Sequence, residues 1–377
     1  MSYEQLTEHR SYLEDPVKLD RYQAAIDLVV KPGDVVLDLG SGTGVLGLMA
    51  ARAGASRVYA VDSGRIISVA RDLARANGYG DVVVGLRALS SELDLDEMID
   101  VVVGDQIGGL AFDAGVNLYY ADIARRLLAP GGRTIPASFE LGLAPVESSD
   151  AYALVESWAA SRAGFDVSPV RRLAANTVQP VQLEAEALLG EAVRCGAMEA
   201  TDDADLQLAA TLEIQRRGVL HGIVGTFRAH MAPGVEMTNE PGDASRMKHR
   251  WQDLLPLEAP TDVLPGDRVS VRVDASPVRG EMAWRVDVTR PGQRQPIARF
   301  RQGTFLGQFL SREDLEEVDA GRVAPAADPA ARLALELADG VRSVADLEAA
   351  LCEAMPERFP TPDSAQHLVA WALAPPR

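Results

Sequence analysis

The stretch VVLDLGSGTGVLGL, residues 35–48, decides the fold of this 377-residue chain. Its first half is mostly valine and leucine, which is typical of a buried strand. Gly40, Gly42 and Gly44 follow at every second position, and glycine lets a backbone pass close to a ligand because it has no Cβ. The apolar residues after Gly44 favour a helix. The segment therefore predicts a strand, a glycine turn and a helix, with a binding site at the turn.

The residues around this stretch repeat the alternation of strands and helices. Apolar runs at 57–62, 81–86 and 99–104 predict further buried strands, and the amphipathic residues 66–77 lie where a crossover helix belongs. Such alternation is typical of a parallel, doubly wound sheet. We therefore expect an α/β, Rossmann-like domain with N-terminal helices over residues 1–140.

Two acidic residues accompany the glycines and narrow the choice of cofactor. The third glycine comes one residue sooner than in the G-x-G-x-x-G turn of dinucleotide-binding enzymes. S-adenosylmethionine (SAM) carries no phosphate, and its ammonium group can be attracted by Asp38. Asp62, beside Ser63 at the end of the next strand, is placed to accept hydrogen bonds from ribose hydroxyls. These residues predict a SAM site, with a nicotinamide or flavin enzyme as the alternative.

The second half of the chain has a different pattern. Alternation with a period near two predicts antiparallel strands in a β-rich, barrel-like domain over residues 141–310. Residues 311–332 are rich in Ala, Pro and Asp and read as a linker. Residues 333–377 predict three short helices around a small apolar core. The chain thus divides into a cofactor domain, a β-rich domain, a linker and a small C-terminal module.

Charge and cysteine content limit the partners. The formal net charge of −18 repels phosphate backbones and attracts cations, so we expect a peptide or small cationic amine as substrate and no nucleic acid. The alternative is that the acidity only keeps the protein soluble. Cys195 and Cys352 are the only cysteines, and nothing has metal-ligand spacing, so no metal is expected. With no signal-peptide pattern and no membrane-length apolar run, we expect a cytoplasmic protein with no membrane association.

The segment HRSYLEDPVKLDRYQAAI, residues 9–26, resembles the signature that precedes the Rossmann domain in protein arginine methyltransferases. RAGASRVYAVD, residues 52–62, is similar to the next step of that family. The resemblance runs from about residue 9 to residue 305 and implies a class I SAM-dependent methyltransferase. It implies that Tyr22 lies over the cofactor and that Lys18 binds the SAM carboxylate. It also implies adenine contacts from Ser90 and Ser91.

Two segments depart from the family pattern at the acceptor site. In GDQIGGLAFDAGV, residues 104–116, Asp105 stands at the place of the family's first glutamate and Asp113 near the second. The resemblance implies that these carboxylates bind the positive charge of the acceptor, with Asp105 as the proton acceptor. In MKHRWQD, residues 247–253, Arg250 stands where the family has a histidine. His249, one step earlier, is therefore a candidate catalytic base or loop-orienting residue.

Three functions are consistent with these features. The first is a peptide N-methyltransferase of a natural-product pathway, acting on an α-amine or a similar compact cation, because the shortened carboxylates suit a smaller group than a guanidinium. The second is N-methylation of arginine, in a protein or free. The third is a catalytically idle SAM-binding scaffold.

Two further expectations come from likeness alone. The insert between residues 164 and 205 falls where the arginine methyltransferases project a dimerisation arm, so a homodimer is expected. The C-terminal module looks like the helical, winged-helix-like modules that bind leader peptides in peptide natural-product pathways. Its alternative role is that of a packing or dimer-stabilising appendage.

Overall fold

A five-stranded parallel sheet forms the first part of the computed structural model, which describes residues 3–279, 281–304, 329–338, 342–361, 364–366 and 368–369. The strand order is β3-β2-β1-β4-β5, so the order reverses between β1 and β4. The strands are β1 (Val35–Leu39), β2 (Arg57–Asp62), β3 (Val83–Arg87), β4 (Ile99–Gly104) and β5 (Leu128–Ile135). The helices are α1 (Tyr3–Leu13), α2 (Pro16–Val29), α3 (Val45–Arg52), α4 (Ile67–Ala76) and α5 (Val116–Arg126). The predicted Rossmann-like α/β class is confirmed.

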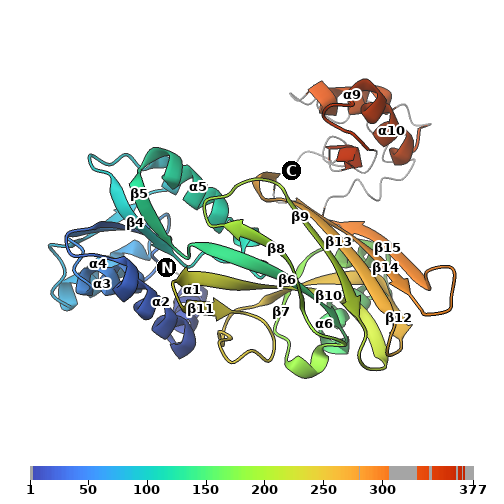
Figure 1. The fold of residues 1–377 in the computed structure, drawn as a ribbon, viewed down its shortest axis with the longest axis horizontal. Coiled ribbons are helices and arrows are strands. Elements are labelled where there is room, and N and C mark those ends of the chain that lie inside the picture. Colours follow the sequence, from blue (N-terminus) through green and yellow to red (C-terminus); the bar gives the residue numbers. More distant parts are fainter. Residues whose placement is uncertain are drawn as a thin grey trace.

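Antiparallel sheets follow directly after Pro136 (Figure 1). One has the order β7-β12-β10-β6-β8 with β11 paired to β10, and the other has the order β15-β14-β13-β9. Their strands are β6 (Ser138–Val146), β7 (Gln179–Val181), β8 (Val193–Glu199), β9 (Leu206–Glu213), β10 (Gly218–Ala232), β11 (Val235–Thr238), β12 (Gln252–Val263), β13 (Arg268–Ser276), β14 (Glu281–Thr289) and β15 (Ala298–Gly303). The helices α6 (Ser149–Glu156) and α7 (Pro169–Ala175) complete this part, which confirms the predicted β-rich region.

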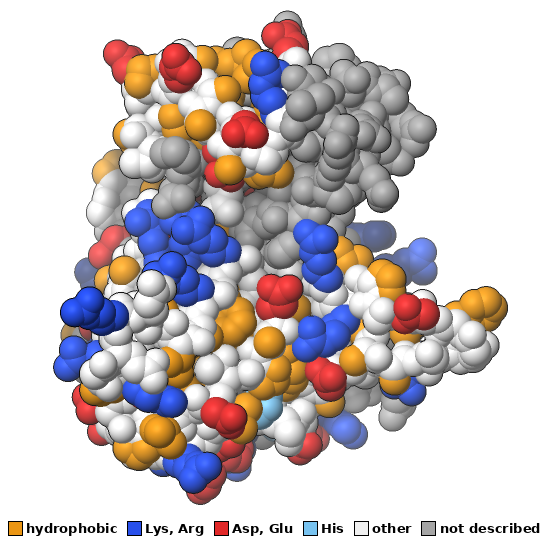
Figure 2. Space-filling model, turned by 90° about the vertical axis from the view of Figure 1, so that its right-hand side faces the viewer, with side chains coloured by type: hydrophobic (Ala, Val, Ile, Leu, Met, Phe, Trp, Pro, Cys, Tyr) orange, Lys and Arg blue, Asp and Glu red, His pale blue; other side chains and the backbone are white. Residues whose placement is uncertain are grey.

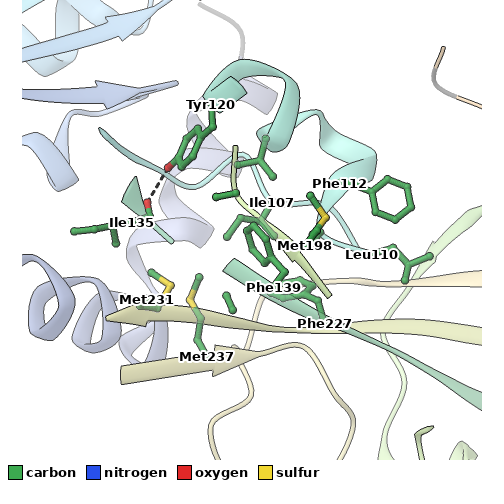
Figure 3. Packing of buried hydrophobic residues seen from close by; sticks show 14 of the residues in the cluster. Ile107, Leu110, Phe112, Tyr120, Ile135, Phe139, Met198, Phe227, Met231 and Met237 are labelled. Atoms are coloured by element: carbon green, nitrogen blue, oxygen red, sulfur yellow. Dashed lines mark hydrogen bonds between the residues drawn. The ribbon is translucent and has the colours of Figure 1, made fainter. Parts of the chain in front are cut away.

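One hydrophobic core joins the parallel sheet to the β-rich part (Figure 3). Phe139 and Phe227 meet edge to face with their ring centres 6.0 Å apart. Ile107 and Leu110, from the segment after β4, are buried in the same core. The Tyr120 hydroxyl donates to the carbonyl of Ile135 at 2.7 Å. Ile107 and Leu110 therefore anchor the segment after β4 in this core.

The C-terminal module has a core of its own. It contains α9 (Pro329–Leu337) and α10 (Val344–Ala354), and Leu347 and Leu351 of α10 are fully buried in it. The predicted linker lies outside the described residues except for residues 329–332, which begin α9 instead. Ala330, Ala334 and Ala338 recur every four residues and are buried, which explains why the helix starts earlier than predicted.

Charge is distributed unevenly over the surface. Arg272, Arg285 and Arg301 lie side by side across β13, β14 and β15. Figure 2 faces this end of the molecule and shows Lys and Arg side chains gathered below the C-terminal module. The Arg285 guanidinium donates to the side chain of Gln366 in that module at 3.0 Å. This face is basic, so the expectation that the negative net charge repels phosphate backbones does not apply to the whole surface.

Within the described residues, no helix combines the length and the apolar character that crossing a membrane requires.

Candidate active site

A cleft of about 340 Å³ opens at the carboxyl ends of β1 and β4, where the strand order reverses. Open α/β sheets bind ligands at this position. Of the residues predicted from the sequence, the cleft is lined by Lys18, Tyr22, Gly40, Gly42, Asp62 and Asp105. Its other walls come from His9, Tyr12, Leu13, Leu19, Ser41, Thr43, Val45, Leu46, Gln106, Ile107, Ala114, Tyr119 and Arg250.

The glycine turn needs its glycines for two separate reasons. Gly40, Gly42 and Gly44 have φ angles of 65°, 53° and 79°, in the left-handed region that side chains disfavour. A Cβ on Gly42 would also lie 2.8 Å from Cε1 of His9, across the mouth of the turn. Gly44 caps the start of α3. The turn is therefore a cradle of bare backbone, as the spacing predicted.

Acidic and hydroxyl groups surround the turn. Asp62 accepts hydrogen bonds from the backbone of Gly42 at 3.0 Å and of Gly64 at 2.7 Å, so it braces the turn while it lines the cleft. The hydroxyl of Ser41 also lines the cleft and has no hydrogen-bond partner among the described residues. A buried hydroxyl without a partner is costly, and a bound polar ligand would satisfy it.

Asp38 lies behind the turn and does not line the cleft. One of its oxygens accepts from the backbone of Gly47 at 2.8 Å, and the other has no partner among the described residues. Burial raises the pKa of Asp38 to about 7. The structure thus places this carboxyl at the base of α3, and its predicted attraction for the cofactor's ammonium group stays a prediction.

The three predicted serines lie outside the cleft. Ser63 is exposed, and its carbonyl accepts from Arg87 at 3.1 Å. Ser90 and Ser91 begin the short 3-10 helix η1 (Ser90–Glu92). The carbonyl of Ser90 accepts from Arg126 at 2.7 Å. Their predicted contacts with the ribose and adenine stay predictions.

Asp105 lies at the centre of a buried charge cluster at the end of β4. Its carboxylate pairs with Lys18 Nζ at 2.7 Å and with the guanidinium of Arg250, and it accepts from the Tyr22 hydroxyl at 3.2 Å. Burial alone would raise the pKa of Asp105, but the charges of Arg250 and Lys18 hold it below its ordinary value. Lys18, predicted to bind the cofactor carboxylate, is thus paired with Asp105 in this structure.

Arg250, rather than His249, enters the cleft. The backbone N–H of His249 donates to Asp15 at 3.1 Å, and the His249 residue is exposed and absent from the cleft wall. Anchored in this way, the chain directs the next side chain inward, where Arg250 also donates to the carbonyls of Ile107 and Asp105. The presence of Arg250 in the cleft was not predicted, and the predicted role of His249 as a base or loop-orienting residue stays a prediction that its exposed position outside the cleft does not support.

Asp113 faces away from the cleft, contrary to the prediction that it joins Asp105 around one acceptor. Its carboxylate accepts from the backbone of Gly109 at 3.1 Å and of Leu110 at 2.8 Å. The physical reason is a tight turn at Ala111, whose φ of 65° and ψ of −64° are rare for a residue with a side chain. The turn folds the loop back around Asp113 and turns the carboxylate toward the β-rich part.

Two residues of the β-rich part that contact the segment after β4 were missed by the sequence reasoning. Asn239 is fully buried and donates to the carbonyls of Gly109 and Trp251, both at 2.7 Å. It therefore connects residues 105–115, the loop after β4 that we call the acceptor loop, to the segment that carries Arg250. Asp253 packs against Gly109, and the neighbouring charge of Asp113 contributes to raising the pKa of its carboxyl group. The only signal for Asp253 was its position two residues after Trp251.

Comparisons with known proteins show what this chain is similar to. A family model described as "Ribosomal protein L11 methyltransferase (PrmA)" matches residues 23–135. "Protein arginine N-methyltransferase 1.1" of Arabidopsis thaliana is 29% identical over 290 residues, which cover 73% of this chain and 73% of that protein. "Probable protein arginine N-methyltransferase 6.2" of Oryza sativa subsp. indica is 34% identical over 155 residues, which cover 40% of this chain and 39% of that protein.

Solved structures of that group share the fold. Arabidopsis thaliana Protein Arginine Methyltransferase 10 matches with a TM-score of 0.65 at 20% identity, covering 79% of this chain and 98% of that one. The Trypanosoma brucei PRMT1 enzyme-prozyme heterotetrameric complex with AdoHcy matches with a TM-score of 0.66 at 22% identity, covering 78% of this chain and 97% of that one.

The chain is an enzyme of the class I SAM-dependent methyltransferases, and SAM is its cofactor. The unpartnered hydroxyl of Ser41, the bare backbone of the glycine turn and the carboxylate of Asp62 all fit that group. Within the class, the chain is related to the protein arginine methyltransferases.

Proposed function

We propose that this enzyme transfers the methyl group of SAM to a nitrogen of a cationic peptide or amine, with the guanidine group of arginine as the favoured acceptor. One observation carries the proposal. A guanidinium, that of Arg250, is bound at the wall of the cofactor cleft by the Asp105 carboxylate and by two backbone carbonyls. An ionised carboxylate with flanking carbonyls is the partner that a guanidinium prefers. The relation to arginine methyltransferases supports the same acceptor.

The chain's own residues would orient the acceptor rather than activate it strongly. SAM supplies a methyl group already activated by its sulfonium, so the nitrogen needs chiefly alignment and the loss of one proton. Asp105 stays ionised at neutral pH because Arg250 and Lys18 hold its pKa down, which makes it a good hydrogen-bond acceptor and a weak base. The proton released as the carbon–nitrogen bond forms passes by way of Asp105 to water.

A second candidate is methylation of an α-amine, as in the modification of peptide natural products. The orientation of Asp113 favours it, because only one of the two predicted carboxylates faces the cleft. A compact ammonium group needs a single carboxylate, whereas the chelation of a guanidinium profits from two. A peptide-binding role for the C-terminal module and cytoplasmic location stay predictions.

Two matched peptides separate the candidates. The first has an internal arginine and an acetylated N-terminus, and the second has a free N-terminus with citrulline, a neutral isostere, at the arginine position. With deuterated-methyl SAM, mass spectrometry should find label on the arginine of the first peptide and none on the second. Label on the second peptide alone would show that the α-amine, and not the guanidine group, is the methyl acceptor. Absence of label from both, and from arginine and other amines, would contradict both candidate acceptors.

We propose that the enzyme is a homodimer whose arm includes α7. Apolar side chains are exposed on this region and on α6, among them Phe165 at 72% and Leu154 at 50%. Exposed apolar side chains that gather on one projection mark contact surfaces. Light scattering should give twice the chain mass for the wild type and a shift toward the monomer for Phe165→Asp. Glu97→Gln, a surface change remote from this region, is the control, and a monomeric wild type would contradict the proposal.

A further inference from the structure

A second cavity lies on the other side of the acceptor loop from the cofactor cleft. Its volume is about 320 Å³, close to that of the cleft. Asp113 and Gly115 line this cavity, whereas Ala114 between them lines the cleft. The opposite wall comes from β12, β13 and β14 of the β-rich part through Asp253, Ser276 and Met282. The loop therefore separates two spaces.

Two carboxyl groups meet in the wall of this cavity. Asp113 and Asp253 both line the cavity, and their carboxyl groups interact electrostatically. Burial, together with the negative charge of Asp113, raises the pKa of Asp253 well above its ordinary value. Burial and the neighbouring charge therefore favour the protonated form of Asp253, and a cation bound beside it would favour the ionised form.

Two buried oxygens at this wall have no hydrogen-bond partner among the described residues. One is Oδ2 of Asp253, a residue only 4% exposed, and the other is the hydroxyl of Ser276, which is 2% exposed. Both residues line the cavity. Buried polar atoms are nearly always paired, so two unpaired acceptors at one cavity wall indicate a ligand with hydrogen-bond donors.

The rest of the lining defines what such a ligand looks like. Among the described residues, no Lys, Arg or His side chain lines the cavity, and Glu281 adds a third carboxyl. Arg250, whose charge interacts with Asp113, lines the cleft and not this cavity. Phe112, Val178 and Met282 supply apolar surface. A primary ammonium on an aliphatic stem matches both the donors and the apolar walls.

We propose that this cavity is a second binding site, separate from methyl transfer, that takes the ammonium-bearing side chain of the acceptor through Asp253, Asp113 and Ser276. The assignment rests on the proposed function for the identity of the acceptor, but binding in the cavity does not require turnover. An ammonium that enters favours the ionised form of Asp253, so the proton that Asp253 holds is released to water. The site would favour acceptors that carry a lysine-like cation beside the methylated residue.

The test uses the full chain saturated with S-adenosylhomocysteine, so that the cofactor pocket is occupied. Pentylamine is the probe and 1-pentanol, of the same length and without charge, is its control. Calorimetric titration at pH 7 in two buffers of different ionisation enthalpy measures both affinity and proton release. We expect pentylamine to bind at least about 10-fold more tightly than 1-pentanol, with release of a proton. Equal affinities, or binding without proton release, would overturn the proposal.

Four variants locate the binding. Asp253→Asn should weaken pentylamine binding about 10-fold or more and abolish the proton release, and Ser276→Ala should weaken it by a smaller factor. Asp96→Asn, an exposed carboxyl remote from the cavity, should change neither quantity. If Asp253→Asn does not fold, the comparison of pentylamine with 1-pentanol in the wild type and the affinity of Ser276→Ala for pentylamine still test the proposal. Binding that Asp105→Asn removes and Asp253→Asn leaves intact would assign the amine to the cleft. Binding in the cavity without methylation of arginine peptides would leave this inference standing while the proposed function fails.

Discussion

Asp105 and Asp113 stand eight residues apart on one loop and resemble the same pair of family carboxylates, yet the structure gives them opposite surroundings. Asp105 directly follows β4, lines the cofactor cleft and is paired with two cations. Asp113 follows a tight turn, faces the β-rich part and meets another carboxyl group. Position in a sequence motif therefore does not by itself assign a role, because the direction of the backbone decides whether a side chain faces the cleft or the β-rich part.

The largest expected effect is at Asp105. Asp105→Asn keeps the shape but removes the charge that orients the acceptor and leaves Lys18 and Arg250 unpaired in a buried place. We expect turnover to fall about 1000-fold or more while SAM affinity changes by less than about 10-fold. Breaking the pairs should also lower the unfolding free energy by about 3 kcal/mol or more. Steady-state kinetics and calorimetry at a temperature well below unfolding measure both. Wild-type turnover in this variant would show that the cluster is only structural.

Asp38 provides a contrasting buried carboxyl group, because no cation of the described residues is paired with it. A pKa raised from 3.8 to about 7 by burial makes the folded state prefer the protonated form. Stability from this group is present below its unfolded pKa and is lost as the pH rises through about 7, by up to about 4 kcal/mol. Asp38→Asn keeps an acceptor for the backbone of Gly47. Denaturant unfolding from pH 5 to pH 9 should show the wild type losing stability relative to the variant, and parallel curves would contradict the assignment.

The local parts of the site could be predicted from sequence, and the long-range parts could not. Gly42 and Asp62 follow from strand and turn periodicity, since each lies at the carboxyl end of a strand or just after it. The pairing of Arg250 with Asp105 spans 145 residues and depends on how the β-rich part docks. The direction of Asp113 depends on the strained turn at Ala111, which no spacing rule signals.

Substitution of Arg250 tests whether its guanidinium occupies the place in the cleft that the guanidinium of an arginine acceptor would take. An internal guanidinium competes with an incoming one at a high effective concentration. Arg250→Ala should therefore lower the KM for an arginine peptide by about 10-fold, provided that the loop keeps its position through Asn239. Arg250→Lys is the matched control, because an ammonium group keeps the charge and loses the fork. A KM that rises in Arg250→Ala would show that this guanidinium helps to bind the acceptor instead of competing with it.

The smallest effect on the chemistry is expected at Asp113. Asp113→Asn keeps one acceptor oxygen for the backbone N–H groups of Gly109 and Leu110, so the loop should stay folded with a modest loss of stability of about 1 kcal/mol. Because the side chain faces away from the cleft, turnover on a saturating arginine peptide should fall by less than about 3-fold. The KM should rise when the peptide carries a neighbouring lysine and should not change when norleucine, which lacks the charge, replaces that lysine. Asp113→Ala removes both acceptors and separates loop folding from charge. A loss of turnover as large as that of Asp105→Asn, with the fold intact, would mean that the loop reverses during catalysis and that both carboxylates bind one acceptor after all.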